Sequence, residues 1–393
     1  MKLNGYLRPD GSVGVRNLIL IIAVDECCEG IARKISEKID NSVVVTNYYT
    51  CMLGGNEETL SNMINAGCNP NVAGALVLAM GCGSIDPNLV AGPINNAGKL
   101  AKTLTCIKNT GTRNTINKGI ELAKEIEEYA NTFKREPVDI SKLIVGVKCG
   151  GSDTSSGIAS NPSVGKSVDL LVDAGATAVS GELFELIGCE DALCNRAVND
   201  DVAQKIRKLI ADEEKRWSVP GADLETMSVG NSVGGLTTIE EKSLGALHKT
   251  GSKPIQGILQ FNQMGYEKPT KPGMYLSEAT MLCGGSAMHF AAVGAQIILW
   301  TSGGAGFNNP LVPVIRVSGN EDLINEDIDI DATDIMKGLK SSDEIGKRIF
   351  DEVIEVANGK KTSIEDIGYS YCSLIQKDIR LEHYLGIKLD KCK

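Results

Sequence analysis

The sequence predicts an α/β protein of two lobes, each with a mostly parallel, Rossmann-like sheet flanked by helices, followed by a helical C-terminal tail. Apolar runs of strand length, such as Leu18 to Val24, alternate with helical stretches along the chain. This alternation is typical of βαβ units and parallel sheets. With 393 residues and 43 glycines, the chain has room for two or three tightly turned domains.

Composition narrows the class of protein. The chain is 42% hydrophobic and 23% charged, with a net charge of −10 and no run rich in Lys and Arg. Nucleic-acid binding needs a basic stripe, so no nucleic-acid partner is expected. No apolar run approaches the roughly 18 residues of a membrane span, and the N-terminus lacks the apolar core of a signal peptide. We therefore expect a cytoplasmic protein with no membrane contact.

The predicted elements divide the chain into three parts. Residues 1–134 form the first lobe, with strands expected at 18–24, 42–46, 73–79 and 103–107 and helices to about 39 and at 57–66, 89–102 and 115–130. Residues 135–140 are expected to be a linker. Residues 141–340 form the second lobe, with strands at 143–147, 176–180, 254–261, 297–300 and 314–317 and helices opening near 163, 199, 238 and 283. Residues 341–393 form a mostly helical segment that packs on the lobes.

Twelve cysteines are many for a cytoplasmic chain, where disulfides are rare. Four of them share one placement, a few residues beyond a predicted strand: Cys27, Cys51, Cys82 and Cys149. Parallel strands present their carboxyl ends at one edge, so these thiols could converge there. A single cysteine is best explained as a buried core residue, whereas the set indicates an iron or iron–sulfur site. Cys68 and Cys106 lack this placement and are expected in the core.

Two glycine-rich loops follow predicted strands and open helices, at residues 148–165 (KCGGSDTSSGIASNPSVG) and 230–246 (GNSVGGLTTIEEKSLGA). Glycines let the backbone approach a ligand, and helix N-termini attract anions. Helix capping alone would also explain the threonines of the second loop. Near the N-terminus, Arg16 could reach an anionic ligand, although a surface arginine beside a turn is the simpler interpretation.

These motifs resemble one known family over nearly the whole chain. The opening GYLRPDGSVGVRN (residues 5–17), the segment VDECCEGIARKI around Cys27 and the segments ending at Cys51 and Cys82 carry the likeness with the two glycine-rich loops. Together they are similar to the altronate/galactarate dehydratase family of sugar-acid hydro-lyases, which also includes the large subunit of sulfolactate sulfo-lyase.

The resemblance implies an iron-dependent lyase that eliminates water from a small hydroxy acid, with Fe(2+) or an iron–sulfur cluster on Cys27, Cys51, Cys82 and Cys149. It offers three acid–base candidates, which the sequence does not rank: Lys148, Glu182 and Lys242. The candidates for holding substrate oxygens are Arg16, Ser152, Asp153, Ser156, Asn161, Thr237 and Thr238. The chain starts at the large-domain motif, so a separate small β-rich (SAF-like) subunit is expected as a partner, together with a homo-oligomeric state.

The sequence departs from the family pattern where substrate would be recognised. The family's TTGRG is here TSGGA, so Gly304 stands at the arginine position, and the family's SET is here Gly181-Glu182-Leu183. Two alternatives therefore stay open. One is a sulfo-lyase that releases sulfite from a sulfonated hydroxy acid such as sulfolactate, and the other is a non-catalytic acid-binding relative.

Overall fold

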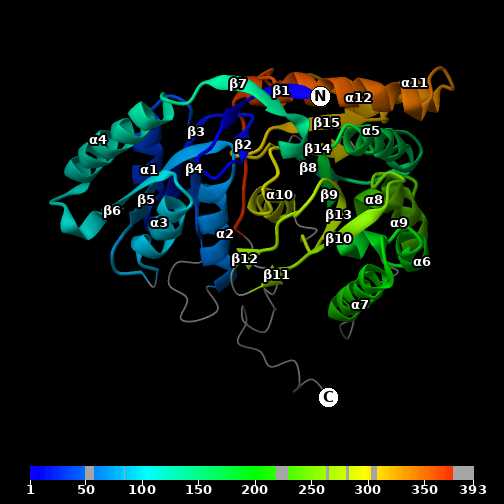
Figure 1. Cartoon of the computed structure of the whole chain (residues 1–393), viewed down its shortest axis with the longest axis horizontal. Coiled ribbons are helices and arrows are strands. Elements are labelled where there is room, and N and C mark those ends of the chain that lie inside the picture. The colour runs from blue at the N-terminus through cyan, green and yellow to red at the C-terminus, as the bar shows by residue number, and fades with distance from the viewer. Residues whose placement is uncertain are drawn as a thin grey trace, which may run out of the picture.

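The computed structural model describes residues 1–48, 57–83, 85–217, 229–262, 265–279, 283–301 and 308–374. It contains two parallel sheets, each flanked by helices, that lie on either side of a central seam (Figure 1). The predicted α/β fold class is thereby confirmed. None of the described helices is both long enough and apolar enough to cross a membrane.

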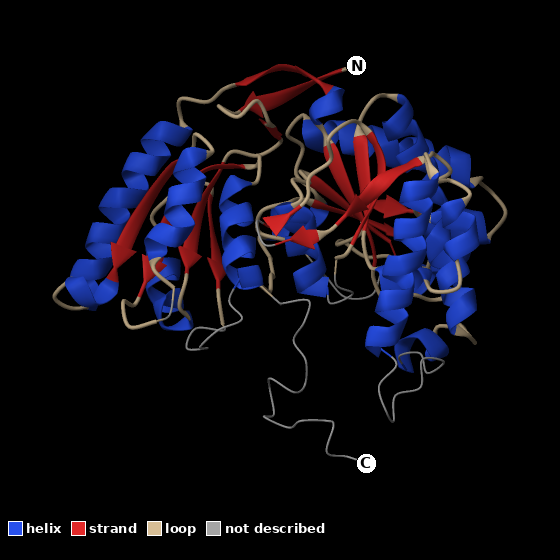
Figure 2. Cartoon of the chain, turned by 60° about the horizontal axis from the view of Figure 1, so that its bottom comes forward, coloured by secondary structure: helices blue, strands red, loops and turns tan. Residues whose placement is uncertain are grey.

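The first lobe carries a four-stranded parallel sheet in the order β4-β3-β5-β6. Its strands point the same way (Figure 2). Apolar side chains fill both faces of the central strands because helices cover both sides, α1 and α4 on one and α2 and α3 on the other. In chain order the elements are β3 (Leu18–Ala23), α1 (Glu29–Ser36), β4 (Ser42–Thr46), α2 (Glu57–Cys68), β5 (Val72–Ala79), α3 (Pro87–Asn96), β6 (Leu100–Thr105) and α4 (Thr112–Ala130).

The second lobe carries a seven-stranded parallel sheet in the order β10-β13-β9-β8-β14-β15-β16. Helices α5, α7 and α12 pack on one face, and α10 packs on the other. The strands are β8 (Ile144–Cys149), β9 (Thr177–Ser180), β10 (Ile255–Leu259), β13 (Gly273–Ser277), β14 (Ile297–Thr301), β15 (Val314–Ser318) and β16 (Ile330–Asp331). The helices are α5 (Asn161–Asp173), α6 (Glu190–Cys194), α7 (Asp200–Trp217), α8 (Val229–Val233), α9 (Ile239–His248), α10 (Cys283–Ala292), α11 (Thr333–Met336), α12 (Ser342–Ala357) and α13 (Ser363–Ile367).

Most of the expected linker at 135–140 is a strand, which the sequence did not predict. Strand β7 (Arg135–Asp139) pairs antiparallel with β1 (Lys2–Leu7), which also pairs with β2 (Val13–Gly14). The turn-rich start of the chain therefore folds back onto the crossing between the lobes. The residues of β7 are mostly polar and show no regular alternation. Because the sequence alone does not reveal the partner strand β1, this pattern did not predict a strand.

The predicted boundary between a helix at 89–102 and a strand at 103–107 is also wrong. Helix α3 ends at Asn96, and Gly98 takes a left-handed φ of 81°, which stops the helix and lets β6 begin at Leu100. Strand β6 consequently ends at Thr105. Cys106 thus directly follows a strand, a placement the sequence did not predict, and it is buried as expected.

Strand β13 and the small hairpin of β11 (Phe261–Asn262) and β12 (Gly265–Tyr266) were not predicted, since short strands leave little periodicity. The C-terminal part is helical in α12 and α13, but residues 371–374 are not helical. The remainder of the expected helical tail, from residue 375, lies outside the described residues. Figure 1 shows the described end of the chain passing between the two lobes.

One hydrophobic core runs through the seam. It joins Leu20, Ile22 and Met63 of the first lobe to Phe290 and Trp300 of the second without interruption. Helix α10 approaches strand β8 closely, because Gly146 has no side chain: a Cβ there would lie 2.9 Å from the Phe290 ring. The lobes therefore share packing along this seam.

Buried amide side chains add hydrogen bonds across the same seam. The Asn69 amide donates to the carbonyls of Ala291 and Ala295, each at 2.9 Å. The Asn71 amide donates to the carbonyls of Gln296 and Leu311 at 3.0 and 2.9 Å. Both asparagines belong to the turn between α2 and β5, so this turn fixes the register of the two lobes.

Beside that turn, Lys99 is buried, and its ammonium caps the end of α2. Lys99 Nζ donates to the carbonyls of Gly67 at 3.3 Å and Asn69 at 2.5 Å. Burial lowers the pKa of Lys99 to about 7, with the charge of Arg8 adding to the effect. Between pH 7 and the ordinary lysine pKa of ~10.4, the unfolded chain therefore binds a proton that the folded chain does not.

We expect the stability of the wild type to rise relative to Lys99→Met as the pH increases from 7 to 9.5. The slope has an upper limit of ~1.4 kcal/mol per pH unit for one proton. Urea unfolding at several pH values measures the free energy of unfolding of both proteins. In the difference between the two, the contributions of the other titrating groups cancel. Lys118→Met, an exposed helix position, serves as a control with a flat difference. A flat difference for Lys99→Met as well would contradict the depressed pKa.

Candidate active site

Two interlocked turns form the carboxyl edge of the first lobe. The buried carboxylate of Asp25, after β3, accepts a hydrogen bond from the backbone N–H of Met80, after β5, at 2.6 Å. Gly83 packs directly on Asp25, so that a Cβ there would lie 2.1 Å from the Asp25 Oδ1 atom. Cys27 and Cys82 sit on these turns and are both exposed. The structure thus brings two of the predicted thiols to neighbouring turns at one edge.

Of the other two predicted ligands, the structure describes only Cys149, which is not part of this pair of turns. Cys51 lies outside the described residues. Cys149 ends strand β8 of the second lobe, where it is buried with its Sγ 3.0 Å from Ser152 Oγ, and burial raises the pKa of its thiol. Within the described ranges, no group of three or more His, Cys, Asp or Glu side chains is arranged to hold a metal ion.

At the carboxyl edge of the second lobe, Lys148 and Glu182 form a buried ion pair. Lys148 Nζ contacts Glu182 Oε1, donates to the Cys149 carbonyl at 2.9 Å and lies 4.9 Å from the centroid of the Trp300 ring. The two side chains are 2% and 1% exposed. Burying two charges is costly unless they are paired and hydrogen-bonded, and this pair is both.

Glu182 also has an unusual backbone conformation. Its φ and ψ are 64° and 59°, the left-handed region, which only Asn41 shares among the described non-glycine residues. Such a conformation costs about 1–3 kcal/mol for a residue with a side chain and is concentrated at functional sites. The bond from the Glu182 N–H to the Ala279 carbonyl, at 3.1 Å, helps to hold it. From this backbone conformation the Glu182 carboxylate contacts Lys148.

Three further charged groups extend the pair. Lys249 Nζ lies 4.0 Å from Glu182 Oε2 and 2.6 Å from Glu185 Oε2. Lys242 Nζ lies 3.5 Å from the other oxygen of Glu185. Helix α9 supplies Lys242, and Lys249 caps its end, whereas both glutamates stand at the turn after β9. We call these five residues, Lys148, Glu182, Lys249, Glu185 and Lys242, the lysine–glutamate cluster.

Burial and pairing set the pKa values within the cluster. Burial raises the pKa of Glu182, although Lys148 opposes the shift. Burial also acts to raise the pKa of Glu185, but Lys249 and Lys242 outweigh it and hold the value at about 2. The pKa of Lys148 and that of Lys249 rise despite burial, because Glu182 and Glu185 respectively favour the charged forms. Glu185 and Lys249 therefore act as a fixed ion pair beside Lys148 and Glu182.

The acid–base candidates from the sequence thus fall in one cluster, with Lys242 at its outer end and 14% exposed. Sequence reasoning missed Glu185 and Lys249 as members. Glu185 stands three residues after Glu182 in a 3₁₀ turn, a spacing that could have indicated it. Nothing in the spacing of Lys249 links it to the turn after β9.

Most of the predicted oxygen-binding residues are engaged in local structure. Asp153 accepts hydrogen bonds from the Ser156 N–H at 2.8 Å and the Asn320 amide at 2.8 Å, and Ser156 Oγ donates back to the Asp153 carbonyl at 2.6 Å. Thr237 donates to Glu241, and Thr238 caps α9.

Asn161 and Asp153, besides these local bonds, have features that suit them to contact a ligand. The buried Asn161 donates to the Gly245 carbonyl at 3.0 Å, and its amide oxygen has no hydrogen-bond partner in the described part of the chain. Asp153, with Thr154 and Ser155, also lines an open pocket of about 400 Å³ that Gly319 and Asn320 close on the other side. This loop is therefore open to a small ligand at that pocket.

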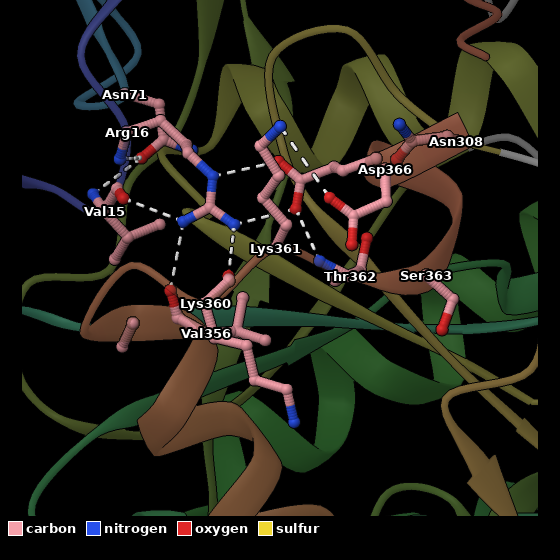
Figure 3. A network of polar contacts seen from close by, with 12 residues as sticks. Val15, Arg16, Asn71, Asn308, Val356, Lys360, Lys361, Thr362, Ser363 and Asp366 are labelled. Atoms are coloured by element: carbon pink, nitrogen blue, oxygen red, sulfur yellow. Dashed lines mark hydrogen bonds and ion pairs between the residues drawn. The ribbon is translucent and has the colours of Figure 1, made fainter. Parts of the chain in front are cut away.

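Arg16 is not brought to this edge. It precedes β3, at the opposite end of the first sheet, and its guanidinium binds the C-terminal part of the chain (Figure 3). Arg16 Nη2 lies 2.7 Å from Glu365 Oε2 and donates to the Lys360 carbonyl at 2.8 Å. Arg16 Nη1 donates to the Val356 carbonyl at 3.0 Å. In the described structure Arg16 fastens the chain end to the first lobe.

Comparison with known families agrees with the two-lobe organisation. The family model described as D-galactarate dehydratase/altronate hydrolase, second domain, matches residues 5–131. The model described as D-galactarate/altronate dehydratase, C-terminal, matches residues 140–379.

Curated proteins show the same relationship. The (2R)-sulfolactate sulfo-lyase subunit beta of Chromohalobacter salexigens is 32% identical over 380 residues, covering 93% of this chain and 95% of that protein. The altronate dehydratase of Bacillus subtilis is 31% identical over 402 residues, covering 96% and 78%. The galactarate dehydratase (L-threo-forming) of Escherichia coli is 30% identical over 394 residues, covering 92% and 74%.

The buried ion pair leads to a prediction about stability. Lys148→Met leaves the carboxylate of Glu182 without its nearest cation, and we expect the free energy of unfolding to fall by about 3–5 kcal/mol. Adding Glu182→Gln removes the stranded charge, so the double variant should be more stable than the single one. Chemical denaturation measures both.

The matched control is Lys208→Met, which removes an exposed lysine from its pair with Asp212. It should leave the free energy of unfolding unchanged. If Lys148→Met alone were as harmless as this control, the pair would not be the buried contact described here.

Proposed function

Since the chain belongs to the D-galactarate/altronate dehydratase family and is therefore a lyase, we propose that it eliminates water from a sugar acid at the lysine–glutamate cluster. The observation that carries this proposal is the buried Lys148–Glu182 pair at the carboxyl edge of the second sheet. In open α/β sheets, ligands bind at that edge. Substrate would approach along it, beside the loop that carries Asp153.

Elimination needs one group that removes a proton from carbon and one that gives a proton to the leaving hydroxyl. A lysine and a glutamate in contact can exchange a proton, so this pair can accept one at the first stage and return it at the second. The fixed charges of Glu185 and Lys249 keep the pair oriented while this happens. Burial excludes water, which would otherwise compete for the proton.

Substrate oxygens need donors and acceptors beside the pair. We propose Ser152, Asp153, Ser156 and Asn161 for this role, with the Asn161 amide oxygen as an acceptor that is buried and unpaired in the described structure. Thr237 and Thr238 stand at the start of α9, where backbone N–H groups favour an anion. Arg16 is left out of the proposal because it binds the chain end.

We further propose that Cys27, Cys51 and Cys82 hold Fe(2+) or an iron–sulfur cluster at the edge of the first lobe. Two exposed thiols on interlocked turns suit iron as donors, whereas Cys149 is buried beside Ser152 and is left out. When bound, such a metal would polarise the carboxylate or the leaving hydroxyl of the substrate. Residues near the described end of the chain touch both lobes: Cys372 lies against the Thr46 backbone of the first lobe, and a Cβ on Gly284 of the second would lie 3.1 Å from Ser373 N.

The sulfo-lyase subunit beta supports a second candidate reaction, elimination of sulfite from a sulfonated hydroxy acid. That relative matches this chain over 95% of its own length, whereas the dehydratases are longer. Gly304, at the family's arginine position, is consistent with a changed substrate. The word subunit in that name also supports our proposal of a separate small β-rich partner. A homo-oligomeric state and a cytoplasmic location remain part of the proposal.

We expect the wild type, with the small subunit present, to convert altronate or galactarate to a keto acid, measured by trapping the carbonyl product. Release of sulfite from sulfolactate, measured in parallel, would favour the second reaction. Lys148→Ala should lower kcat by at least ~100-fold because the proton-transfer group is lost. Lys208→Ala is the matched control and should retain activity. Binding of all three acids without any product would instead support a non-catalytic relative.

The metal proposal has its own test. We expect protein purified without oxygen to contain iron, and Cys27→Ser, Cys51→Ser and Cys82→Ser each to lose most of it. Cys189→Ser removes a buried thiol of the second lobe and should retain the iron. Iron and acid-labile sulfide analyses give the readout. Unchanged iron in all three variants would remove the proposed site.

A further inference from the structure

A pair of thiols lies beneath the turns that carry Cys27 and Cys82. The Sγ atoms of Cys28 and Cys106 are 3.5 Å apart, although the residues are 78 positions apart in the chain. Cys28 is fully buried and Cys106 is 7% exposed. The structure describes ten cysteines, all with free thiols. The contact between two thiols recorded among them is that of Cys28 with Cys106.

The sheet brings the two thiols together. Strands β3 and β6 lie on either side of β5, and all three are parallel, so their carboxyl ends share one edge. Cys28 ends the 3₁₀ turn after β3, and Cys106 directly follows β6. The turn after β5 bridges them, because Met80 donates to Asp25 and its carbonyl accepts from the Ile107 N–H at 3.1 Å.

We propose that Cys28 and Cys106 form a site of reversible oxidation, at which a peroxide converts the two thiols into a disulfide. Cys106, the less buried of the two, attacks one peroxide oxygen; the O–O bond breaks, one water leaves and a sulfenic acid forms. The sulfur of Cys28 then displaces the hydroxyl group, which leaves as a second water with the remaining thiol proton. Two electrons pass from the sulfurs to one peroxide, and a small dithiol reverses the reaction.

The geometry suits this reaction. The sulfurs need to approach by only about 1.5 Å to reach the ~2.05 Å length of a disulfide. Both residues belong to short turns at strand ends and lie outside the hydrogen-bond ladder of the sheet. The bond would tie the turn bearing Cys27 to the end of β6. This inference does not depend on the proposed reaction or on a bound metal.

The experiment uses the full-length wild type, reduced, freed of reductant and treated with a few equivalents of hydrogen peroxide. Remaining thiols are blocked with N-ethylmaleimide in denaturant, and the protein is digested with trypsin. Cys106 falls in the peptide 103–108 (TLTCIK), and Cys28 falls in the peptide 17–33 with Cys27. We expect these two peptides to be cross-linked, with two thiols lost per chain, and the link to disappear after dithiothreitol.

Cys27→Ser is the matched control, since it alters the neighbouring exposed thiol and should keep the cross-link. Cys28→Ser should abolish it. The wild-type digest decides the question even if a variant folds poorly. Absence of the cross-link in the wild type, or its loss in Cys27→Ser with retention in Cys28→Ser, would overturn the proposal.

Discussion

The packing of α10 against the first lobe is the constraint on which the rest of the structure depends. This helix fills the space between the two sheets, and the core around it contains strand residues of both lobes. The amides of Asn69 and Asn71 then fix how the lobes register, because each must satisfy carbonyls of the opposite lobe. A buried amide without partners would cost roughly 1–3 kcal/mol, so other relative positions are disfavoured.

This arrangement determines where chemistry can occur. Parallel strands collect their carboxyl ends at one edge of each sheet, so the turns after β3 and β5 lie together at one edge and the cluster lies at the ends of β8 and β9. Lys148 and Lys249, which come from separate elements, pair with the same carboxylate, that of Glu182, because helix α9 packs beside the turn after β9.

Much of this could be predicted from the sequence. Long apolar runs such as that of β3 have one physical explanation, a strand covered on both faces, and the glycine-rich loops mark strand ends. Two of the three acid–base candidates, Lys148 and Lys242, belong to those loops, and the third, Glu182, follows a neighbouring strand of the same sheet. By contrast, strand β7 forms by pairing with β1 near the N-terminus, and Lys249 reaches the cluster through helix packing. Neither feature has a local sequence pattern that would predict it. Arg16 illustrates the opposite error, since a lead-in arginine near a turn looks available in sequence but binds Glu365 in the fold.

The two family models divide this chain near residue 135, yet the division does not mark independent folding units. Each half, taken alone, would expose its hydrophobic part of the shared core to solvent. Large exposed hydrophobic surfaces promote aggregation. Gene fission or domain exchange at that boundary would therefore require both fragments to assemble as they fold. Selection must therefore conserve the fit between the two halves as a single character.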